Sequence, residues 1–531
     1  MRPGGDEAAR RYEVRVGGDG TVARTYHSRT SYAVERMPRP GIPGFVPMDP
    51  RNRPRPFKRY PQARVHPLPT DLPPTGAPAA AALSGRVPPG DATVDLELLA
   101  RLLFFSAGVT RMARGAGETI WFRAAPSAGN LHPLEVYAVA GGMPGLDAGL
   151  YHFAPDVFGL EQLAAGDGRP AVADAVAVPE VATAPLALVI TGIPLRTAWK
   201  YAERGLRHVY WDSGTLLANL LAVAEGHRLP TRVLLGFVDD DLSRRVGIDG
   251  RTEFPVAVVV VGTPAEPATA GREELAEPHL AATPPAPAPF EFPLITRAQQ
   301  AGNLATPEQV TAWRAAAPAG LRRAPETVDP PPGARAEPIE SVVLRRGSTR
   351  RMRREVAATE LLQWGMAAGT RHVPADALPA GASLLSHELA VHAVRGMDPG
   401  LYHWVEGRAQ SYRAASETAV RQLSRHLCLD QPLGGDSAYT EFPCADLDHV
   451  LDAYGDRGYR VAQLEAGVDA GRLQLAAFTL DYGGTGLTFF DAEVSAAFGT
   501  RAACMLAVAI GIPAYPAKPG GPPGRPTRLA W

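Results

Sequence analysis

The alternation of apolar and polar positions predicts a chain of mixed helices and strands. Residues 94–108, VDLELLARLLFFSAG, place apolar side chains at helical spacing, and residues 210–226, YWDSGTLLANLLAVAEG, predict a second strong helix. Residues 135–140 and 187–193 are apolar or alternating and predict strands, while residues 255–264, PVAVVVVGTP, predict a buried strand that ends in a turn. This mixture predicts an α+β fold.

Two segments interrupt the pattern. Residues 39–92 are rich in Pro and Arg and predict an extended arm with turns. Residues 264–338 contain TPPAPAPFEFP and DPPPGARAEP and predict a Pro-rich linker, with one short helix near TPEQVTAWRAAA. The segments predicted from these boundaries are an N-terminal extension at 1–92, a first domain at 93–263, the linker at 264–338 and a second domain at 339–531.

After the linker, features of the first domain return in diverged form. GLYHF at 149–153 is echoed by GLYHW at 400–404, an offset of 400 − 149 = 251, and RGLR at 204–207 is echoed by RGYR at 457–460. Three single residues have counterparts at nearly the same offset, namely Tyr201 with Tyr454, Gly214 with Gly467 and Phe237 with Phe490. The chain is therefore predicted to hold two divergent copies of one domain. Such copies can form an intrachain pseudo-dimer whose ligand site draws residues from both.

Composition and charge exclude several classes of protein. With 531 residues, 45% of them hydrophobic, the chain can bury more than one core. Its formal charge of 54 − 55 = −1 gives no sign of a nucleic-acid or anionic-membrane partner. Cys428, Cys444 and Cys504 have no paired spacing, so we expect neither a metal site nor a disulfide framework. Without a visible secretory segment or an apolar run long enough to cross a bilayer, we expect a soluble cytoplasmic protein.

Residues 122–137, FRAAPSAGNLHPLEVY, place a small-residue turn in front of a predicted strand. A turn of this kind lets backbone amides approach a flat or anionic ligand. The alternative is an ordinary turn that leads into a strand.

Five segments, in this order, carry a resemblance to a known family: PSAGNLHPLEVY, GLYHF, WKYAERGLRH, DSG…NLLAVA and VGIDGRTEFPVAVVVVG. Together they resemble the FMN-dependent nitroreductase superfamily and, more narrowly, the SagB-type azoline dehydrogenases of thiazole/oxazole-modified peptide biosynthesis. The resemblance covers about residues 26–262, and residues 338–512 resemble a more divergent member of the same superfamily. It implies two tandem nitroreductase-like domains with FMN at their junction.

The resemblance places the small-residue turn against the flavin ring. Ser127 and Asn130 would donate or accept side-chain hydrogen bonds, and Gly129 would allow close approach. The residues implied to contact the ring are Pro126, Ser127, Ala128, Gly129 and Asn130.

For the flavin phosphate, the superfamily uses an Arg-x-Ser-x-Arg signature. The second domain offers RRGSTRRM, in which Arg346, Ser348 and Arg350 fit this spacing, and guanidinium groups suit phosphate oxygens. The alternative is a solvated basic face. The first domain has AALSGRV at the corresponding place, with Ala82 where the first arginine would be. One composite FMN per chain is the simplest prediction, and two per chain remains the alternative.

WKYAERGLRH places Lys200 beside Tyr201, and a Lys-Tyr pair at this place is the catalytic motif of the azoline dehydrogenases that the chain resembles. Azoline oxidation removes a proton from one ring carbon and a hydride from its neighbour, which passes to flavin N5. A lysine can accept the proton where burial or nearby cations favour its neutral form. The alternative is a solvated lysine beside a core tyrosine. The second domain has Ala453 and Tyr454 here, so the first domain is expected to carry the chemistry.

Three further residues are candidates for substrate contact: His132, Glu135 and Arg204. His132 and Glu135 flank the flavin-side turn, but each could equally cap a strand. His208 is expected to be structural.

The resemblance thus implies an FMN-dependent dehydrogenase of azoline rings in a peptide, with dioxygen as the final oxidant and a cyclodehydratase as a candidate partner. Two alternatives stay open. One is an NAD(P)H-dependent nitro- or quinone-type reductase, or another natural-product flavin oxidase acting on a small molecule. The other is a non-catalytic scaffold of a peptide-modifying complex. The chain is expected to be a pseudo-dimeric monomer or a homodimer.

Overall fold

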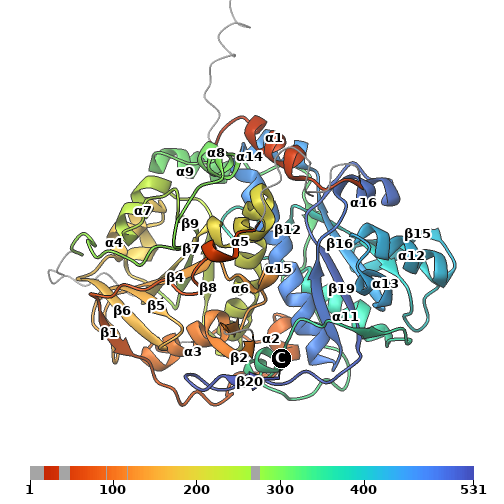
Figure 1. Ribbon diagram of the computed structural model, residues 1–531, viewed down its shortest axis with the longest axis horizontal. Coiled ribbons are helices and arrows are strands. Elements are labelled where there is room, and N and C mark those ends of the chain that lie inside the picture. Colours follow the sequence, from red (N-terminus) through yellow and green to blue (C-terminus); the bar gives the residue numbers. More distant parts are fainter. Residues whose placement is uncertain (1–16, 35–47, 91, 116–117, 265–274, 531) are drawn as a thin grey trace, which may run out of the picture.

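The computed structural model describes residues 17–34, 48–90, 92–115, 118–264 and 275–530. Figure 1 shows two lobes side by side, with the first lobe (residues 93–263) in orange to green and the second lobe (residues 339–530) in teal to blue. Two long helices, α6 (Gly205–Gly226) and α15 (Arg457–Thr479), lie between the two sheets. Among the described residues, no helix combines the length and the apolar character needed to cross a membrane.

The first lobe is built on a seven-stranded antiparallel sheet in the order β1-β6-β5-β4-β7-β9-β8. Six strands come from the lobe itself: β4 (Leu134–Ala140), β5 (Gly149–Ala154), β6 (Gly159–Ala165), β7 (Leu186–Gly192), β8 (Thr231–Leu234) and β9 (Phe254–Val261). The edge strand β1 (Arg64–Pro67) is contributed by the N-terminal extension. Every residue of β4, β7 and β9 is buried, as their apolar runs predict. Two residue-level expectations are thus confirmed, the strands at 135–140 and 187–193.

Helices cover this sheet and lead into the second lobe. They are α2 (Ala79–Leu83), α3 (Leu96–Ala107), α4 (Arg169–Ala175), α5 (Pro194–Tyr201), α6 and α7 (Asp239–Val246). α3 begins where the Asp95 carboxylate accepts a hydrogen bond from the Leu98 amide and ends at Gly108. The α+β fold predicted for this part of the chain is confirmed.

The second lobe has a sheet in the order β11-β19-β16-β13-β14-β15, with β17 paired to β19 and β18 to β16. Its strands are β11 (Met352–Arg353), β13 (Leu385–Val391), β14 (Gly400–Val405), β15 (Arg408–Ala414), β16 (Tyr439–Ala445), β17 (Gly483–Leu487), β18 (Ala503–Cys504) and β19 (Ala507–Pro513). The order β15-β14-β13-β16-β19-β17 matches the order β6-β5-β4-β7-β9-β8 of the first sheet. The echoed segments GLYHF and GLYHW form the corresponding strands β5 and β14.

The helices of the second lobe follow the same sequence of elements. They are α10 (Ile339–Arg345), α11 (Thr359–Gly369), α12 (Glu417–Leu427), α13 (Pro432–Asp436), α14 (Leu447–Tyr454), α15 and α16 (Asp491–Phe498). α6 and α15 touch through the two echoed glycines. A Cβ atom on Gly214 would lie 2.3 Å from the Leu464 carbonyl oxygen, and one on Gly467 would lie 2.4 Å from the Trp211 carbonyl oxygen. Only residues without a side chain fit this crossing.

The other echoed motif, Arg-Gly-x-Arg, forms reciprocal ion pairs between the lobes. Arg204 and Arg207 of the first lobe lie 2.9 and 2.5 Å from the carboxylate of Asp491, the first residue of α16. Arg457 and Arg460 of the second lobe lie 2.6 and 3.1 Å from the carboxylate of Asp239, the first residue of α7. We call these two sets the interlobe clamps. Contact of this reciprocal kind is what an approximate two-fold axis produces.

The part of the interlobe segment that the structure describes, residues 275–338, carries two helices, α8 (Pro293–Ala301) and α9 (Pro307–Ala315), where the sequence predicted one. Trp313 of α9 is fully buried and packs against Tyr454, with 5.0 Å between ring centroids and 39° between ring planes. A two-stranded piece, β10 (Arg322–Arg323) with β12 (Ala382–Ser383), ties the segment to the second lobe. Proline-rich composition therefore marks a segment that packs on the lobes.

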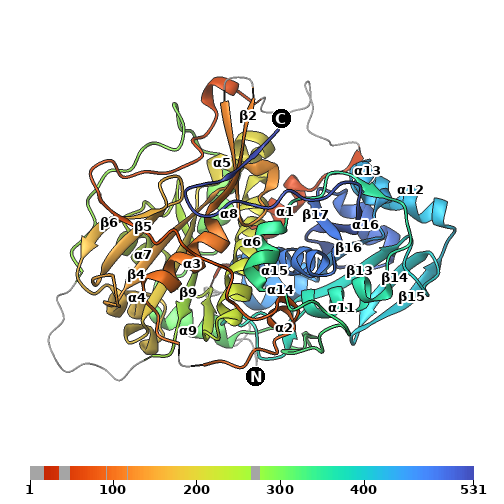
Figure 2. The same ribbon diagram turned by 90° about the horizontal axis from the view of Figure 1, so that it is seen from below.

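The described residues nearest to each end of the chain also pack on the lobes. The N-terminal part includes α1 (Thr21–Thr30) and the short helix η3 (Pro50–Asn52), and Lys58 forms a buried ion pair with Glu253. At the other end, β20 (Thr527–Leu529) joins β2 (Val109–Gly115) and β3 (Glu118–Arg123) in a three-stranded sheet. Figure 2 shows the blue C-terminal strand crossing to the first lobe beside β2.

Candidate functional site

A cavity of about 930 Å³ lies where the two lobes meet, within the size range of sites for small molecules and cofactors. The first lobe lines it with residues 125–130 and with Lys200 and Tyr201. The second lobe lines it with residues 346–350 and 485–488. The structure therefore brings the predicted ring-side turn, the predicted dyad and the predicted phosphate-binding arginines into one cavity.

The turn at residues 126–130 is held from behind by its own polar side chains. The Ser127 hydroxyl and the Ala128 amide donate to the two carboxylate oxygens of Asp212 on α6, at 2.5 and 3.0 Å. Asn130 donates to the Trp121 carbonyl at 2.8 Å, and its side-chain oxygen lies 3.0 Å from Nε2 of His132. The side chains of Ser127 and Asn130 thus bind within the protein and shape the turn.

Asp212 is the one carboxylate among the described residues that line this cavity. Burial raises its pKa to about 7, although the hydrogen bonds from Ser127 and Ala128 act in the opposite direction. Its main contact is structural, because both oxygens already accept hydrogen bonds from the turn.

Lys200 and Tyr201 end α5 next to this turn. A Cβ atom on Gly129, whose φ is +62°, would lie 2.9 Å from the Tyr201 hydroxyl and 3.3 Å from Cδ of Lys200. Among the described residues, neither the Lys200 ammonium nor the Tyr201 hydroxyl has a hydrogen-bond or ion-pair partner, and the ammonium lies 5.4 Å from the Tyr201 ring centroid. Burial raises the pKa of Tyr201 above its ordinary value. Both polar ends are therefore available to a ligand.

Two buried arginines, one from each lobe, meet at the cavity without a carboxylate. Arg346 donates to the Ala124 carbonyl, and Arg111 on β2 donates to the carbonyls of Lys518 and Arg346. Burial lowers the pKa of Arg346 to about 9, with a contribution from Arg111, and burial lowers the pKa of Arg111 to about 10. Nε of Arg346 is buried with no partner among the described residues. Buried guanidinium groups without a counter-ion favour an anionic ligand.

The other residues of the predicted phosphate signature lie in the same loop. The Thr349 amide donates to the Gly484 carbonyl, and the Arg350 amide donates to the Tyr515 hydroxyl oxygen at 3.0 Å. Ser348 and Arg350 both line the cavity, and so does His132.

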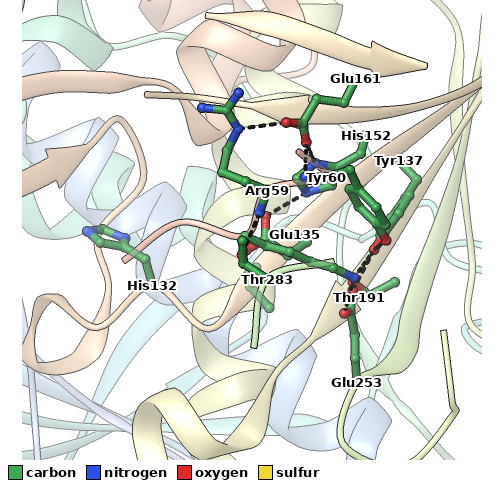
Figure 3. Close-up of polar contacts among 12 residues, drawn as sticks. Arg59, Tyr60, His132, Glu135, Tyr137, His152, Glu161, Thr191, Glu253 and Thr283 are labelled. Carbon is green, nitrogen blue, oxygen red and sulfur yellow. Dashed lines mark hydrogen bonds and ion pairs between the residues drawn. The ribbon is translucent and has the colours of Figure 1, made fainter. Parts of the chain in front are cut away.

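Glu135 and Arg204 do not line the cavity. Glu135 lies 2.6 Å from Arg196 and 3.1 Å from His152, whose other ring nitrogen is 2.9 Å from Glu161. Burial alone would raise the pKa of Glu135, but Arg196 and His152 hold it well below its usual value. Figure 3 shows Glu135, His152 and Glu161 joined in one cluster, with His132 apart from it.

Arg204 belongs to an interlobe clamp, as described above, and its guanidinium also lies 4.2 Å from the Tyr32 ring centroid. The Arg-Gly-x-Arg echo was visible in the sequence. This motif forms a contact between the lobes. The expectation that Arg204 contacts the substrate was wrong, because its side chain is buried against Asp491.

The turn near Leu384 in the second lobe contacts α15 in the same way as the turn at residues 126–130 contacts α6. The Leu384 amide donates to the Glu465 carboxylate on α15 at 3.1 Å, and burial raises the pKa of Glu465 above its ordinary value. Near Ser84, however, protein fills the space. Trp364 donates to the Ser84 hydroxyl, and the Val328 amide donates to the Ser84 carbonyl.

Sequence reasoning missed several cavity residues. Arg111 lies in β2, which carries no recognised motif, and its partners come from the second lobe and the C-terminal segment. Asp212 belongs to the quoted DSG segment, but its contact with the turn was not predicted. His208 and Gln474 also line the cavity, and the buried side-chain oxygen of Gln474 has no partner among the described residues.

Comparisons with known proteins agree with this fold. Residues 90–263 match the nitroreductase family. A protein of Methanocaldococcus jannaschii, provisionally named a nitroreductase, is 29% identical over 168 residues, which are 32% of this chain and 80% of that protein.

Among solved structures, a protein from Anabaena variabilis ATCC 29413, provisionally described as a nitroreductase, matches with a TM-score of 0.70. The match covers 93% of this chain and 99% of that chain at 24% identity, so it shows a shared fold. A chain of the E. coli microcin synthetase McbBCD complex covers 47% of this chain at 20% identity, but its TM-score of 0.29 supports no further conclusion. By sequence and by fold, residues 90–263 are therefore similar to proteins of the nitroreductase family.

Proposed function

We propose that the chain is an FMN-dependent oxidoreductase that holds one flavin where its two lobes meet. The observation that carries this proposal is the pair of buried guanidinium groups, Arg111 and Arg346, which come from different lobes and have no carboxylate partner among the described residues. A phosphate dianion supplies the missing charge, and it can accept hydrogen bonds from the unpartnered Nε of Arg346. Ser348 and Arg350 would hold the same phosphate from the following loop.

The turn at residues 126–130 fits the flat part of the flavin. Gly129 leaves room that a side chain would fill, and the hydrogen bonds to Asp212 and to the Trp121 carbonyl occupy the side chains of Ser127 and Asn130. Ring contact through backbone atoms therefore replaces the side-chain contacts expected of Ser127 and Asn130. A rigid turn costs little reorganisation when a flat ligand binds.

We also infer that the two lobes are diverged copies of one nitroreductase-like domain. Matching strand order, the reciprocal clamps at Asp239 and Asp491, and the matching contacts of Asp212 and Glu465 support this inference. The packing of Trp364 and Val328 around Ser84 favours a single flavin per chain, because protein fills the place where a second site would be built.

The proposed reaction is the dehydrogenation of azoline rings in a peptide. FMN, when bound, supplies the acceptor for the hydride. Lys200 accepts the proton from the neighbouring ring carbon, and the Tyr201 hydroxyl orients the ring or relays that proton. A cyclodehydratase would supply the azoline, since this ring is the product of that class of enzyme.

Lysine usage supports the role of Lys200. The chain has 54 basic residues, of which only Lys58, Lys200 and Lys518 are lysines. Lys58 is buried in an ion pair with Glu253, while Lys200 and Lys518 line the cavity. Arginine keeps its proton at any ordinary pH and cannot serve as a base. Lys200 and Lys518 are therefore the lysines that line the cavity, and the Lys518 ammonium already donates to the Arg528 carbonyl, which leaves Lys200 as the candidate base.

Anaerobic rapid mixing of the flavin-loaded protein tests the reaction. We expect a thiazoline-containing peptide to bleach the flavin absorbance rapidly, and NADH and NADPH to bleach it slowly. Lys200→Ala and the charge-matched Lys200→Arg should both slow bleaching by about 10²–10⁴-fold, the usual contribution of a general base, with flavin content unchanged.

Other outcomes would indicate other functions. Full activity in Lys200→Arg would show that Lys200 acts only as a charge. Rapid bleaching by NAD(P)H, without any effect of Lys200→Ala, would indicate a nitro- or quinone-type reductase. Protein that never takes up flavin but binds a cyclodehydratase would indicate a scaffold.

A further inference from the structure

A buried histidine lies directly behind the dyad. His208, in the first turn of α6, stacks its ring on Tyr201 with 3.9 Å between centroids and 28° between planes. Trp211, almost one turn further along, packs its edge against His208 at 4.6 Å and 86°. His208 is only 2% exposed. Aromatic contacts of this geometry restrict both rings.

The ring nitrogens of His208 form no hydrogen bond with any described residue. Both nitrogens are buried. Each unpaired polar atom of this kind costs stability. Burial, followed by Arg204, Arg207 and Lys200, holds the pKa of His208 well below its usual value, so the ring is neutral. The contact of His208 with Tyr201 is therefore the stacking of two uncharged rings.

The turn that carries His208 is fixed by the second lobe. Arg207 precedes His208 directly and pairs with Asp491, and Arg204 at the start of α6 pairs with the same carboxylate. Between the dyad and this turn the chain reverses through Ala202, whose φ is +47°. The position of His208 is thus set by an interlobe clamp on one side and by a tight reversal on the other.

We propose that His208 is a positioning residue, which holds the Tyr201 ring by stacking and so links the clamp at Asp491 to the geometry of the Lys200–Tyr201 dyad. This inference rests on the proposed role of the dyad. Stacking places the Tyr201 hydroxyl beside Gly129, where a ring at the turn would meet it. Small displacements of a reacting group reduce turnover strongly.

Two variants separate the stack from the ring nitrogens. His208→Ala removes the stack, and we expect it to lower kcat by about 10- to 100-fold with little change in KM. His208→Phe keeps a flat ring and removes the unpaired nitrogens, so we expect near-normal kcat and a higher melting temperature. A histidine that matters only for folding would not give this split between kcat and KM together with rescue by Phe.

A readout without substrate accompanies the kinetics. In protein labelled with 3-fluorotyrosine, the ¹⁹F signal of Tyr201, identified by its loss in Tyr201→Phe, should shift in His208→Ala and return close to its place in His208→Phe. Asp491→Asn should shift the same signal, because it releases the turn that carries His208.

The results overturn the proposal in two ways. An unchanged Tyr201 signal in His208→Ala would show that the stack does not hold the ring. A His208→Phe protein as slow as His208→Ala would assign the effect to the ring nitrogens. If the wild type fails to oxidise azoline peptides, the proposed function fails, while the ¹⁹F signals still decide whether His208 positions Tyr201.

Discussion

Replacing Asp491 by asparagine removes the shared counter-ion of Arg204 and Arg207. Both guanidinium groups are almost fully buried, with side-chain exposures of 1% and 0%, and the Asp491 side chain is 5% exposed. Asparagine keeps the shape of the side chain and an accepting oxygen. The substitution therefore tests the charge of the clamp while it leaves the packing in place.

Two estimates give the size of the effect. Burial would raise the pKa of Asp491, but Arg204 and Arg207 lower it from 3.8 to about 2, which corresponds to about 2–3 kcal/mol of stability at neutral pH. Breaking a buried ion pair from one side costs about 3–5 kcal/mol, because the remaining charge stays buried. We therefore expect a loss of about 3 kcal/mol.

Scanning calorimetry measures this loss. Unfolding entropy is about 2 cal/mol/K per residue, so a chain of this length that unfolds as one unit would melt about 3 °C lower. Asp239→Asn should give a similar shift, because Arg457 and Arg460 lose their counter-ion in the same way. Asp241→Asn, on α7 like Asp239, is the control, since its side chain is 22% exposed and that of its partner Arg244 is 56% exposed, and a partly exposed pair of this kind is worth at most about 1 kcal/mol.

The reasoning fails if the clamps behave like surface ion pairs. If the Asp491→Asn and Asp239→Asn proteins melt at the same temperature as Asp241→Asn, the two lobes are held together by packing alone. Unequal shifts at Asp491 and Asp239 would show that the clamps are not equivalent.

Three further predictions follow from single positions. Because the pKa of Asp491 is lowered in the folded chain, its contribution to the free energy of unfolding should be complete above about pH 4 and lost as the pH falls toward about 2. The melting temperature of the wild type should therefore fall more steeply with acid than that of Asp491→Asn. Ala202 has φ +47° and ψ −138°, and Gly455 takes the corresponding conformation in the second lobe. Ala202→Gly should raise the free energy of unfolding by about 1 kcal/mol, since relief of about 1–3 kcal/mol of strain exceeds the entropy cost of glycine. A lower melting temperature in calorimetry would contradict the strain. Gly467→Val should abolish a single cooperative melting transition, because its side chain would meet the Trp211 carbonyl, whereas Gly365→Ala, where the nearest atom is 3.4 Å away, should melt like the wild type.

Local patterns predicted much of the fold. The apolar spacing of α3 and the long apolar run of β9 depend on neighbours in sequence, so both elements were visible. The echoes of GLYHF and RGLR were also visible, because a repeat is a property of the sequence itself. Their partners were not visible, since Arg204 pairs with Asp491, which lies 287 residues further along the chain.

The candidate site was predictable where a motif carried it. The signature around Arg346 and the turn at residues 126–130 are recognisable as short strings, and both line the cavity. Arg111 carries no such string, and its importance comes from the loss of water around it and from carbonyl partners in the second lobe and the C-terminal segment. Glu135 illustrates the converse, because proximity to the turn in sequence suggested a ligand while its side chain points into a buried ionic cluster.

The most direct test of the central claim is the flavin content of the purified protein, counted per chain from the absorbance of released FMN. The composite site predicts about one FMN per chain, and a large loss of flavin in both Arg111→Ala of the first lobe and Arg346→Ala of the second lobe. Arg86→Ala, an exposed arginine paired with Asp329 near Ser84, should keep its flavin. Full flavin in Arg111→Ala, two FMN per chain, or none after soaking with FMN would contradict a single site built from both lobes.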